Sequence, residues 1–403
     1  MSNELTIIGA GPAGMTAALF AARSGAAVTL IDGNPSPGRK LLVTGAGRAN
    51  LTNQRLDASR YTCADPSWLM QVFARFGHGE LLAFLESIGV LTYATHDGWC
   101  YPLSESAQAV VNAFQAALEE AGVRLLMDHK VMSIRNTSAG FEIGFKTQRP
   151  LACSTLLVAA GGAAYPNLGS RGQLYPLLKQ LGHTVILPRP ALAPLTCNMA
   201  PYRDLHGVRL DAQACLYAGD QLLAETTGNL IFTAWGLNGP AVMDLSHHVS
   251  ARPGADLRLE LTPLVASAGA LRALLRAKRS GDYPLTVLLG AVLPPKLPPV
   301  LLPMAGLAPD ARINTVTDSQ LEVLLRLLTA IPFKVTGVRG FEFCQVSAGG
   351  VPVSEVDPLS MRSRIVPGLL LAGEIIDVVG PCGGYNLQFA FSTGAIAGMN
   401  LNA

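Results

Sequence analysis

The sequence predicts an α/β protein in which a long insertion interrupts the chain that forms a parallel sheet. Strand and helix patterns alternate over residues 1–190 and return after residue 340, which is typical of strands joined by helical crossovers. Short alternating segments, and then helices with proline-rich loops, lie between these parts. We therefore expect one discontinuous α/β domain (1–190 plus 340–403), an inserted antiparallel barrel or sandwich (191–262) and a small inserted helical subdomain (263–339).

The chain begins with the pattern of a strand, a tight turn, a helix and a second strand. Leu5–Ile8 is a short apolar run, as expected for a strand that is buried on both faces of a sheet. An alanine-rich stretch from Met15 to Arg23 predicts the helix. Val28–Ile31 predicts the second strand, which ends at Asp32. This is the βαβ unit from which a Rossmann-type fold is built.

The turn of this unit carries the glycine pattern of a dinucleotide site. Gly9 permits the tight turn, Gly11 lets backbone N–H groups approach a pyrophosphate, and Gly14 lets the helix pack closely on the strand. The start of the helix at Pro12 adds a partial positive charge where the phosphates would lie. Asp32 can accept hydrogen bonds from an adenosine ribose.

The remaining elements follow from periodicity and turn chemistry. In the α/β domain we expect helices at 107–121 and 386–400, strands at 123–127, 155–159 and 368–374, and an antiparallel pair at 131–135 and 141–146. In the insertion we expect strands at 208–217, 221–226, 229–233 and 256–261, and helices at 270–278, 286–292 and 318–330. The strand at 155–159 runs into Ala160-Gly161-Gly162, small residues that suit a chain passing beneath a cofactor.

Composition and charge narrow the classes of function. A formal net charge of +2 over 403 residues gives no electrostatic argument for nucleic acid, and we expect the basic run of residues 272–279 to be a solvated helix face. The seven cysteines form no CxxC pair, which argues against a metal site and fits a reducing cytoplasm. A strand that starts by residue 5 leaves no room for a signal peptide, and glycine and proline interrupt every long apolar stretch. We expect a cytoplasmic protein without a transmembrane segment.

Three further segments distinguish FAD from NAD. Gly38–Asn53 follows the second strand and contains Arg39 and Lys40, which can neutralise a pyrophosphate. Gly373-Glu374 ends a buried strand, where the carboxylate can accept a hydrogen bond from a ribityl hydroxyl. Gly380–Asn386 opens the last helix, whose N–H groups would face the flavin N1–C2=O edge and raise the flavin potential. Together with the first glycine motif, these segments predict FAD.

These segments resemble the flavoprotein family of aminoacetone oxidases and bile-acid dehydro-reductases, which also includes a ribosomal-RNA dihydrouridine synthase. The resemblance covers nearly the whole chain and is carried by Gly38–Asn53 (GRKLLVTGAGRANLTN), Ser347–Val351 (SAGGV) and Gly368–Gly398, which contains GEIIDVVGPCGGYN. It implies FAD in a two-dinucleotide-binding-type fold, with a β-barrel and a helical subdomain inserted.

The chain departs from the family pattern at two positions. Ala49 stands where the family usually has the cysteine of GRCN, and Ala234 stands where FTH-x-G-x-SGP has its histidine. Thiol and imidazole are natural proton donors beside a flavin that reduces a C=C bond. Two interpretations stay open: the chain lacks the family's C=C reduction, or both positions only pack.

The predicted site combines a large FAD set with a small set of catalytic candidates. Asp377 is either an acid–base group or a loop cap, Tyr385 is favoured for flavin binding over catalysis, and Trp235 and Asn238 could face the flavin as an aromatic wall and an amide. The residues expected to bind FAD are Gly9, Gly11, Pro12, Ala13, Gly14, Asp32, Gly33, Arg39, Lys40, Leu41, Thr44, Gly45, Gly47, Arg48, Asn50, Val131, Ala160, Gly161, Gly162, Gly373, Glu374, Gly383, Gly384, Tyr385 and Asn386.

We expect an FAD-dependent oxidoreductase that transfers a hydride between flavin N5 and a small organic substrate. No second GxGxxG follows a strand in the middle third of the chain, so NAD(P)H would bind only transiently. The enzyme would be either a reductase that uses NAD(P)H or an oxidase that uses O₂. The alternatives are a flavin-binding protein with a structural or regulatory role, and an RNA-modifying flavin reductase.

Overall fold

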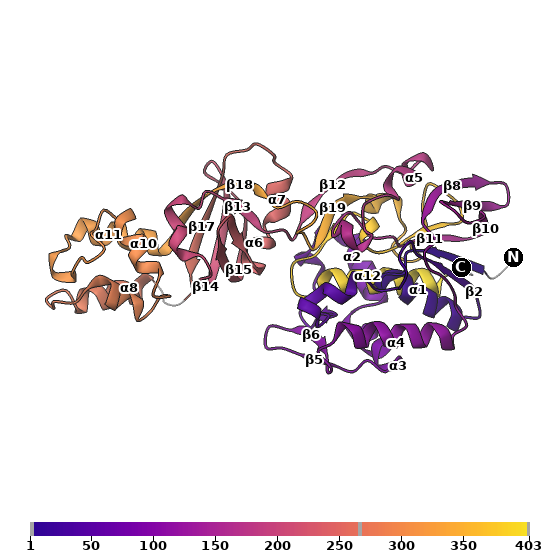
Figure 1. The fold of residues 1–403 in the computed structure, drawn as a ribbon, viewed down its shortest axis with the longest axis horizontal. Helices are drawn as coiled ribbons and strands as arrows, with labels where there is room; N and C mark the ends of the chain where they lie inside the picture. The colour runs from indigo at the N-terminus through magenta and orange to yellow at the C-terminus, as the bar shows by residue number, and fades with distance from the viewer. Residues whose placement is uncertain (1–3, 265–267, 401–403) are drawn as a thin grey trace. The chain divides into compact units, whose positions relative to one another are not determined.

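The computed structural model describes residues 4–264 and 268–400, and the chain divides into two compact units. The first unit combines residues 1–189 with residues 345–403, and the second consists of residues 190–344. Each unit has its own hydrophobic core. The predicted fold class is confirmed: a Rossmann-type domain formed by both ends of the chain, an inserted β-barrel and a group of helices (Figure 1).

The first unit is built on a parallel sheet with the strand order β20-β11-β1-β2-β7. The central strand β1 (Glu4–Ile8) lies between β2 (Ala27–Ile31) and β11 (Leu156–Val158). β7 (Arg124–Leu126) pairs with β2, and β20 (Leu369–Leu371) pairs with β11. The C-terminal part of the chain therefore completes the sheet that the N-terminal part begins.

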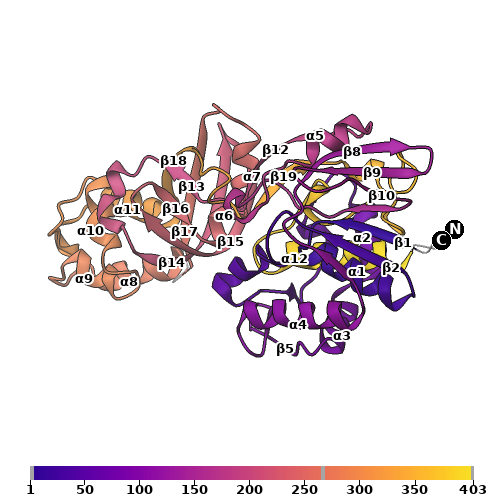
Figure 2. The same ribbon diagram turned by 45° about the vertical axis from the view of Figure 1, so that its right-hand side comes forward.

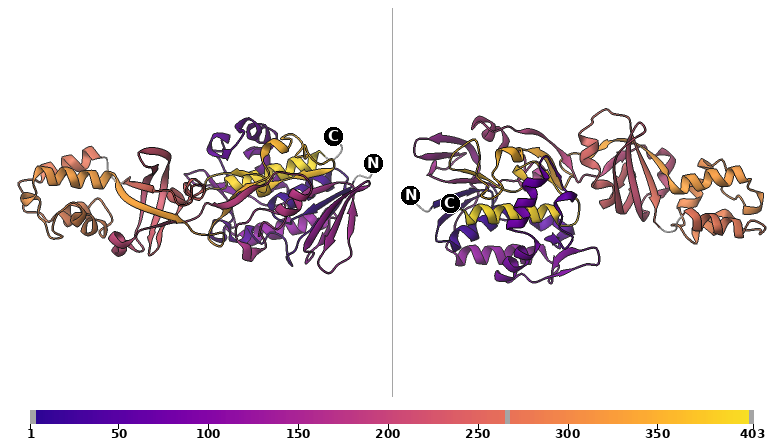
Figure 3. Two further views of the ribbon diagram at one scale, coloured as in Figure 1. Left: turned by 90° about the horizontal axis from the view of Figure 1, so that it is seen from above. Right: turned by 180° about the vertical axis from the view of Figure 1, so that it is seen from behind.

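Two helices from opposite ends of the chain pack closely on each other. Helix α1 (Pro12–Arg23) lies beside the last helix, α12 (Tyr385–Met399) (Figures 1 and 3). A Cβ atom at Gly394 would lie 2.2 Å from the carbonyl oxygen of Ala13, so only glycine allows this approach of the two backbones. The other helices of this unit are α2 (Pro66–Arg75), α3 (His78–Ser87), α4 (Ala107–Glu120) and α5 (Tyr175–Gln180).

Short strands outside the parallel sheet complete the first unit. The predicted pair at 131–135 and 141–146 is present as β8 and β9 and gains a third strand, β10 (Figure 2). Two of the sheets have three strands, with the orders β10-β9-β8 and β3-β6-β5, and two have two strands, β21-β4 and β12-β19. The bounds are β3 (Thr52–Asn53), β4 (Thr62–Cys63), β5 (Thr92–Ala94), β6 (Trp99–Pro102), β8 (Val131–Thr137), β9 (Gly140–Phe145), β10 (Leu151–Cys153), β12 (Ile186–Ala191), β19 (Val346–Gly350) and β21 (Val378–Val379).

The second unit contains a closed antiparallel barrel with the order β13-β16-β15-β14-β17-β18. Its interior is filled by alternating residues such as Leu210, Ala212, Ala214 and Leu216, all fully or nearly fully buried. The strands are β13 (Leu195–Cys197), β14 (Arg209–Ala218), β15 (Gln221–Thr233), β16 (Gly236–Asn238), β17 (Leu257–Pro263) and β18 (Ile331–Val338). Strand β18 lies within the range 263–339 that is expected to be helical, so the expectation is wrong for these residues. Its residues alternate between buried and more exposed positions, and it pairs with β17 and β13 and closes the barrel.

The helices of the second unit are α6 (Pro240–Met243), α7 (Ser246–Ser250), α8 (Ala268–Ala277), α9 (Leu285–Gly290), α10 (Leu297–Met304) and α11 (Asp318–Thr329). Helix α10 lies where a proline-rich loop is expected from the sequence, and that expectation is wrong. Pro298 stands in the first turn, where a missing N–H costs no intrahelical hydrogen bond. Arg272 pairs with Glu322 at 2.9 Å and Arg279 pairs with Asp318 at 3.2 Å, so part of the basic run is neutralised within the unit.

A buried hydrogen-bonded chain stabilises the first unit away from the sheet edge. The fully buried side chain of His183 has its Nδ1 atom 2.6 Å from Glu355 Oε2 and its Nε2 atom 2.9 Å from Ser363 Oγ. The backbone N–H of Thr184 also donates to Glu355. Burial alone would raise the pKa of the Glu355 carboxyl, but the hydrogen bonds from Thr184 and His183 outweigh burial and lower that pKa.

We expect Glu355→Gln to reduce the free energy of unfolding by about 1–3 kcal/mol at pH 7, because the neutral amide is a weaker acceptor for His183 and Thr184 than the carboxylate and its NH2 group replaces one acceptor oxygen. A carboxyl whose pKa is lowered by folding stabilises the protein above its ordinary pKa, here 4.5, and this stability is lost as the pH falls below that value. Urea denaturation between about pH 7 and pH 3.5 tests both effects. A Glu355→Gln variant whose free energy of unfolding falls as steeply with decreasing pH as that of the wild type would contradict this account. Glu119→Gln, on the exposed face of α4, is the control.

Candidate functional site

The predicted cofactor residues gather where the parallel strands end. Gly9 follows β1, Asp32 follows β2, Ala160–Gly162 follow β11 and Gly373-Glu374 follow β20. Because the strands are parallel, their carboxyl ends meet at one edge of the sheet, which is where doubly wound folds bind ligands. The structure thus brings together residues from positions 9 to 374 of the chain.

The N-terminus of α1 has the features of a phosphate site. Its N-cap, Gly11, makes no side-chain capping bond, and there is no acidic residue in the first turn, which includes Pro12, Ala13 and Gly14. A Cβ atom at Gly11 would have no neighbour within 4 Å, whereas a Cβ atom at Gly14 would lie 1.8 Å from the carbonyl oxygen of Gly9. Gly14 therefore packs the helix on the turn, and Gly11 leaves its N–H groups open to an anion.

Asp32 links the turns that follow β1 and β2. Its Oδ2 atom accepts from the N–H of Ala10 at 2.8 Å, and its Oδ1 atom accepts from the backbone and side-chain nitrogens of Asn34 at 2.8 and 2.9 Å. Arg39 in turn donates to Asn34 Oδ1 at 2.9 Å. The Asp32 carboxylate still has lone pairs for a ribose, while the guanidinium of Arg39 is positioned by Asn34 rather than free in solvent.

The main chain beside Asp32 forms the rest of this end of the site. The backbone N–H of His129 donates to the carbonyl oxygen of Asp32 at 2.8 Å. Gly33 is exposed, and a Cβ atom there would lie 3.5 Å from the Cα atom of Lys130. Val131, at the start of β8, is 7% exposed. The segment at 129–131 therefore borders the region proposed for the adenosine.

An ion pair joins two motifs that are more than 300 residues apart in the sequence. Lys40 Nζ lies 2.5 Å from Glu374 Oε2, while Glu374 Oε1 accepts from the N–H and the hydroxyl of Ser347 at 2.8 and 2.9 Å. Ser347 Oγ also accepts from the N–H of Ala163 at 2.9 Å. A Cβ atom at Gly162 would lie 2.1 Å from Ser347 Oγ, so the small residues after β11 make room for this network. Lys40 therefore has its charge balanced by Glu374.

Tyr175 belongs to the same network but was missed in the sequence analysis. Its hydroxyl donates to the carbonyl oxygen of Glu374 at 3.3 Å, and its side chain is 4% exposed. Burial raises the pKa of this phenol, and the negative charge of Glu374 raises it further. Tyr175 lies in a helix of six residues without a recognisable motif, so the sequence contained no signal that could have found it.

The loop before α12 is held by the strand that ends the Gly38–Asn53 motif. A Cβ atom at Gly384 would lie 2.4 Å from the carbonyl oxygen of Thr52, and Asn53 donates to the carbonyl oxygen of Gly383 at 3.0 Å. The side chain of Asn386 spans the loop: it accepts from the N–H of Gly380 at 2.9 Å and donates to its carbonyl oxygen at 2.8 Å. These contacts fix the main-chain N–H groups at the start of α12.

The side chain of Tyr385 has a structural environment. It is 3% exposed, and its hydroxyl donates to the carbonyl oxygen of Arg55 at 3.2 Å. The hydroxyl of Tyr61 donates to the carbonyl oxygen of Tyr385 at 2.8 Å. The phenol of Tyr385 is therefore a tether for the loop, and any contact with a flavin would come from its backbone.

The loop at 41–50 combines buried side chains with two glycines of positive φ. Leu41 is fully buried, and Thr44 Oγ1 donates to its carbonyl oxygen at 2.7 Å. Gly45 and Gly47 have φ values of 56° and 87°. The guanidinium of Arg48 lies 4.6 Å from the ring centroid of Tyr101. Asn50 is buried and, with its amide oriented to donate, reaches the carbonyl oxygens of Cys100 and Thr52 at 3.3 and 3.1 Å.

Ala49 is fully buried within the apolar core of the first unit. Position 49 is therefore a packing position, which favours the second of the two interpretations for this alanine.

We expect Ala49→Cys to destabilise the first unit by about 1–3 kcal/mol, because the sulfur atom overfills a packed site. The added thiol should react with a disulfide reagent only after unfolding, since burial keeps it inaccessible and raises its pKa. Labelling before and after denaturation measures this, with Ala49→Ser as the control for size. Rapid labelling of the folded protein would show that position 49 is open to the site.

The catalytic candidates come from both units. Asp377 Oδ1 accepts from the N–H of Gly349 at 2.7 Å, so Asp377 caps the loop that carries Ser347. Trp235 and Asn238 belong to the second unit, where Asn238 Oδ1 accepts from the N–H of Gly239 at 2.8 Å. Ala234 is exposed in the turn between β15 and β16. Of the two departures from the family pattern, the one at position 234 is open to solvent.

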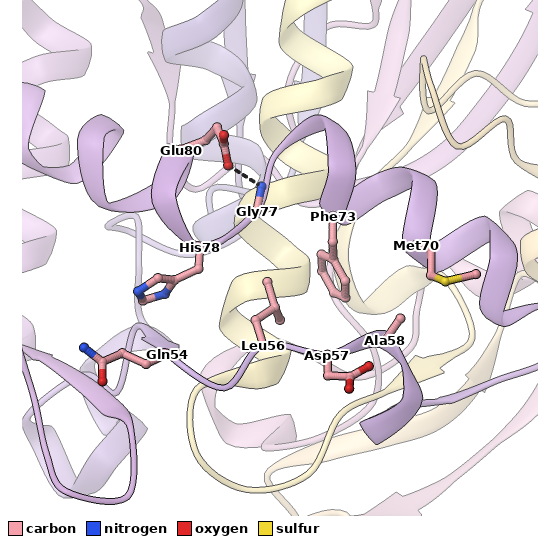
Figure 4. Close-up of a pocket in the computed structure, with 9 residues that line it drawn as sticks. All are labelled: Gln54, Leu56, Asp57, Ala58, Met70, Phe73, Gly77, His78 and Glu80. Atoms are coloured by element: carbon pink, nitrogen blue, oxygen red, sulfur yellow. Dashed lines mark hydrogen bonds between the residues drawn. The ribbon is translucent and has the colours of Figure 1, made fainter.

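A surface groove with a cavity volume of about 400 Å³ lies beside the site, between the segment at 54–58 and helices α2 and α3 (Figure 4). The side chains of Leu56, Phe73 and His78 point toward it. Burial lowers the pKa of His78, whose Nδ1 atom lies 3.3 Å from Thr52 Oγ1. Thr52 Oγ1 donates to Gln388 of α12, so a polar path connects the groove with the start of the last helix.

Residues 4–264 and 268–400 contain no cluster of three or more histidine, cysteine, aspartate or glutamate side chains that could hold a metal ion. Within the same ranges, no helix combines the length and the apolar character needed to cross a membrane.

Comparisons with known proteins indicate the family of this chain. The family model described as HI0933-like protein Rossmann domain matches residues 3–400. The chain is 35% identical over 403 residues to the 3-dehydro-bile acid delta(4,6)-reductase of Clostridium scindens, with 98% of each chain covered. It is 30% identical over 395 residues to the ribosomal RNA dihydrouridine synthase of Escherichia coli, with 97% of this chain and 96% of the relative covered.

The structure is also similar to a 3-ketosteroid delta1-dehydrogenase from Sterolibacterium denitrificans, with a TM-score of 0.53, 11% sequence identity and 99% of both chains covered. At that identity the likeness shows the fold alone. The family match, the two relatives that align over almost the whole chain, and the convergence of the glycine motifs at one sheet edge all point to the same family. This chain belongs to the HI0933-like family and is an FAD-dependent oxidoreductase.

Proposed function

We propose that this protein reduces a carbon–carbon double bond conjugated to a ketone in a flat apolar substrate, with NAD(P)H as the electron source. The overall reaction consumes the double bond, one NAD(P)H and one proton, and yields the saturated ketone and NAD(P)⁺. The relative that is 35% identical is named for the delta(4,6) reduction of a 3-dehydro-bile acid, which is chemistry of this class. Bound FAD would supply hydride transfer through its N5 atom.

The single observation that supports cofactor binding best is the network of Lys40, Glu374 and Ser347 over Gly162. In the proposed arrangement, the open N–H groups at Gly11 hold the pyrophosphate, and Asp32 holds the adenosine ribose. Glu374, which Lys40 and Ser347 hold in place, would accept a hydrogen bond from the ribityl chain. The N–H groups at the start of α12, beside Gly384, contact the pyrimidine edge of the flavin.

The proton of the reaction goes to the carbon next to the ketone after hydride addition at the far carbon. Ala234 supplies no proton donor, and position 49 is buried. We propose that solvent supplies this proton, which makes its transfer slower than with a positioned acid. RNA as the substrate is less favoured, because Arg272 and Arg279 of the basic run already pair with carboxylates.

Anaerobic stopped-flow spectroscopy tests this proposal. We expect NADPH or NADH to bleach the flavin absorbance of the holoprotein, and a 3-oxo-Δ4 steroid to restore it with formation of the saturated product. The saturated 3-oxo steroid is the control. If neither nucleotide reduces the flavin, the proposed electron source is wrong. If an amine or an amino-ketone reduces the flavin and only O₂ reoxidises it, the protein is an oxidase.

Replacement of the exposed Ala234 by histidine tests the proton step. We expect Ala234→His to accelerate reoxidation by the 3-oxo-Δ4 steroid by about 10- to 100-fold, at the low end of general acid catalysis for a side chain that the chain has not positioned. The gain should disappear above about pH 6.5, where imidazole loses its proton. Ala234→Gln is the control for size and polarity. Equal rates for both variants would place position 234 away from the reacting carbon.

A further inference from the structure

The second unit holds one arginine between two aromatic rings at the edge of the barrel. Arg339 follows β18, and its Cζ atom lies 4.7 Å from the ring centroid of Trp235 and 3.2 Å from that of Phe343. The backbone fixes two of these residues: the N–H of Arg339 donates to Pro194 O at 2.9 Å, and Trp235 O accepts from the N–H of Cys197 at 3.2 Å. The guanidinium is therefore held in place by cation–π contacts on a rigid strand end.

The hydrogen-bond donors of this guanidinium are unused. In the part of the chain that the structure describes, Arg339 has no side-chain hydrogen bond and no ion pair. Other arginines of the unit differ: Arg258 pairs with Glu260 at 3.2 Å and Arg272 pairs with Glu322 at 2.9 Å. Arg339 is only partly exposed, so its immobilised donors form a preorganised position for an anion.

The surroundings of Arg339 favour an organic anion over an inorganic one. Phe343 is 43% exposed, and Trp235 is partly exposed, so both offer apolar surface beside the charge. Ala234, next to Trp235, is exposed and adds a methyl group rather than a polar side chain. A planar guanidinium matches the two oxygens of a carboxylate, and the rings match a hydrophobic body attached to it.

We propose that Trp235, Arg339 and Phe343 form a recognition site for a carboxylate carried on a large hydrophobic ring system. This inference rests on the proposed function, since it assigns the carboxylate to the substrate of that reaction. Arg339 binds the carboxylate through two parallel N–H···O bonds, and the rings cover the adjoining apolar part. Arg339 is then a residue that determines substrate specificity and takes no part in the transfer of hydride or proton.

Calorimetric titration of the full-length holoprotein with cholate, below its micelle-forming concentration, tests this site without turnover. Methyl cholate serves as the uncharged partner. We expect wild-type protein to bind cholate about 10- to 100-fold more tightly than the ester, as for hydrogen bonds to a charged group. Arg339→Gln should bind cholate as weakly as the ester. Arg258→Gln, which removes a ring-stacked arginine that has its own carboxylate partner, should bind like wild type.

Equal affinity of wild-type protein for cholate and its ester, or no binding of cholate, would overturn the proposal. Unchanged cholate affinity in a folded Arg339→Gln protein would also overturn it. Bound flavin and near-ultraviolet circular dichroism show whether the variant is folded. If it is not, the affinities of the wild-type protein for cholate and methyl cholate still test the proposal. Flavin reduction by NAD(P)H and reoxidation by an uncharged 3-oxo-Δ4 steroid test the proposed function independently, so the two failures are distinguishable.

Discussion

Replacement of Gly14 by alanine is expected to abolish FAD binding and to destabilise the first unit by more than about 3 kcal/mol. A Cβ atom at position 14 would lie 1.8 Å from the carbonyl oxygen of Gly9, which is backbone and cannot move aside as a side chain could. Helix α1 would have to shift away from the turn and from α12, against which Gly394 packs it closely. Denaturant unfolding and flavin titration measure the two effects.

The matched control is Gly11→Ala, at a position where a Cβ atom has no neighbour within 4 Å and φ is −83°. Any residue adopts this backbone conformation, so we expect unfolding of the ligand-free protein to change by less than about 0.5 kcal/mol. The methyl group would nevertheless occupy the approach to the N–H groups of α1, and FAD affinity should fall about 10- to 100-fold. Normal FAD affinity in Gly11→Ala would contradict the proposed position of the pyrophosphate.

The second large effect is expected for Glu374→Ala. The ion pair with Lys40 is 2.5 Å long and partly buried, with 24% of the lysine side chain and 17% of the glutamate side chain exposed. Removal of the carboxylate leaves the ammonium group and two donors of Ser347 without their acceptor. We expect a loss of about 2–4 kcal/mol in the free energy of unfolding, somewhat below the cost at a fully buried pair, and a loss of FAD affinity of about 100-fold.

A double variant separates the two roles of Glu374. Addition of Lys40→Met to Glu374→Ala removes the unpaired charge, so stability should recover by at least about 1 kcal/mol. FAD affinity should not recover, because the proposed hydrogen bond from Glu374 to the ribityl chain is still missing. Full recovery of affinity in the double variant would show that Glu374 acts on the cofactor only through Lys40. Glu120→Ala, on the exposed end of α4, controls for loss of one carboxylate.

Local signals were sufficient to predict the fold class. Each of the strands β1, β2, β11 and β20 is a short apolar run next to a glycine or small-residue turn, and such runs are recognisable without tertiary information. Strand β18 and helix α10 were not recognisable in this way. β18 becomes a barrel strand only by pairing with β13 and β17, and α10 needs the packing of its leucines to offset its prolines.

The roles of single residues depended on contacts that no motif contains. Asp377 and Asn386 lie in a flavin-type motif, yet their side chains bind the main chain of Gly349 and Gly380. Tyr175 has no motif, yet it contacts Glu374. Hydrogen bonds between residues that are far apart in the sequence are set by how the elements pack, and the sequence pattern around each residue contains no record of them.

By itself, the sequence determined that this protein has a discontinuous Rossmann-type domain with an inserted antiparallel sheet and helices, and its glycine motifs predict a dinucleotide site. These properties follow from periodicity and turn chemistry, which are local. Only the tertiary structure decided that Lys40 is neutralised by Glu374, that Ala49 is a packing position and that Arg339 lies between Trp235 and Phe343. The physical reason is that charge balance, burial and stacking depend on which distant segments the fold brings into contact.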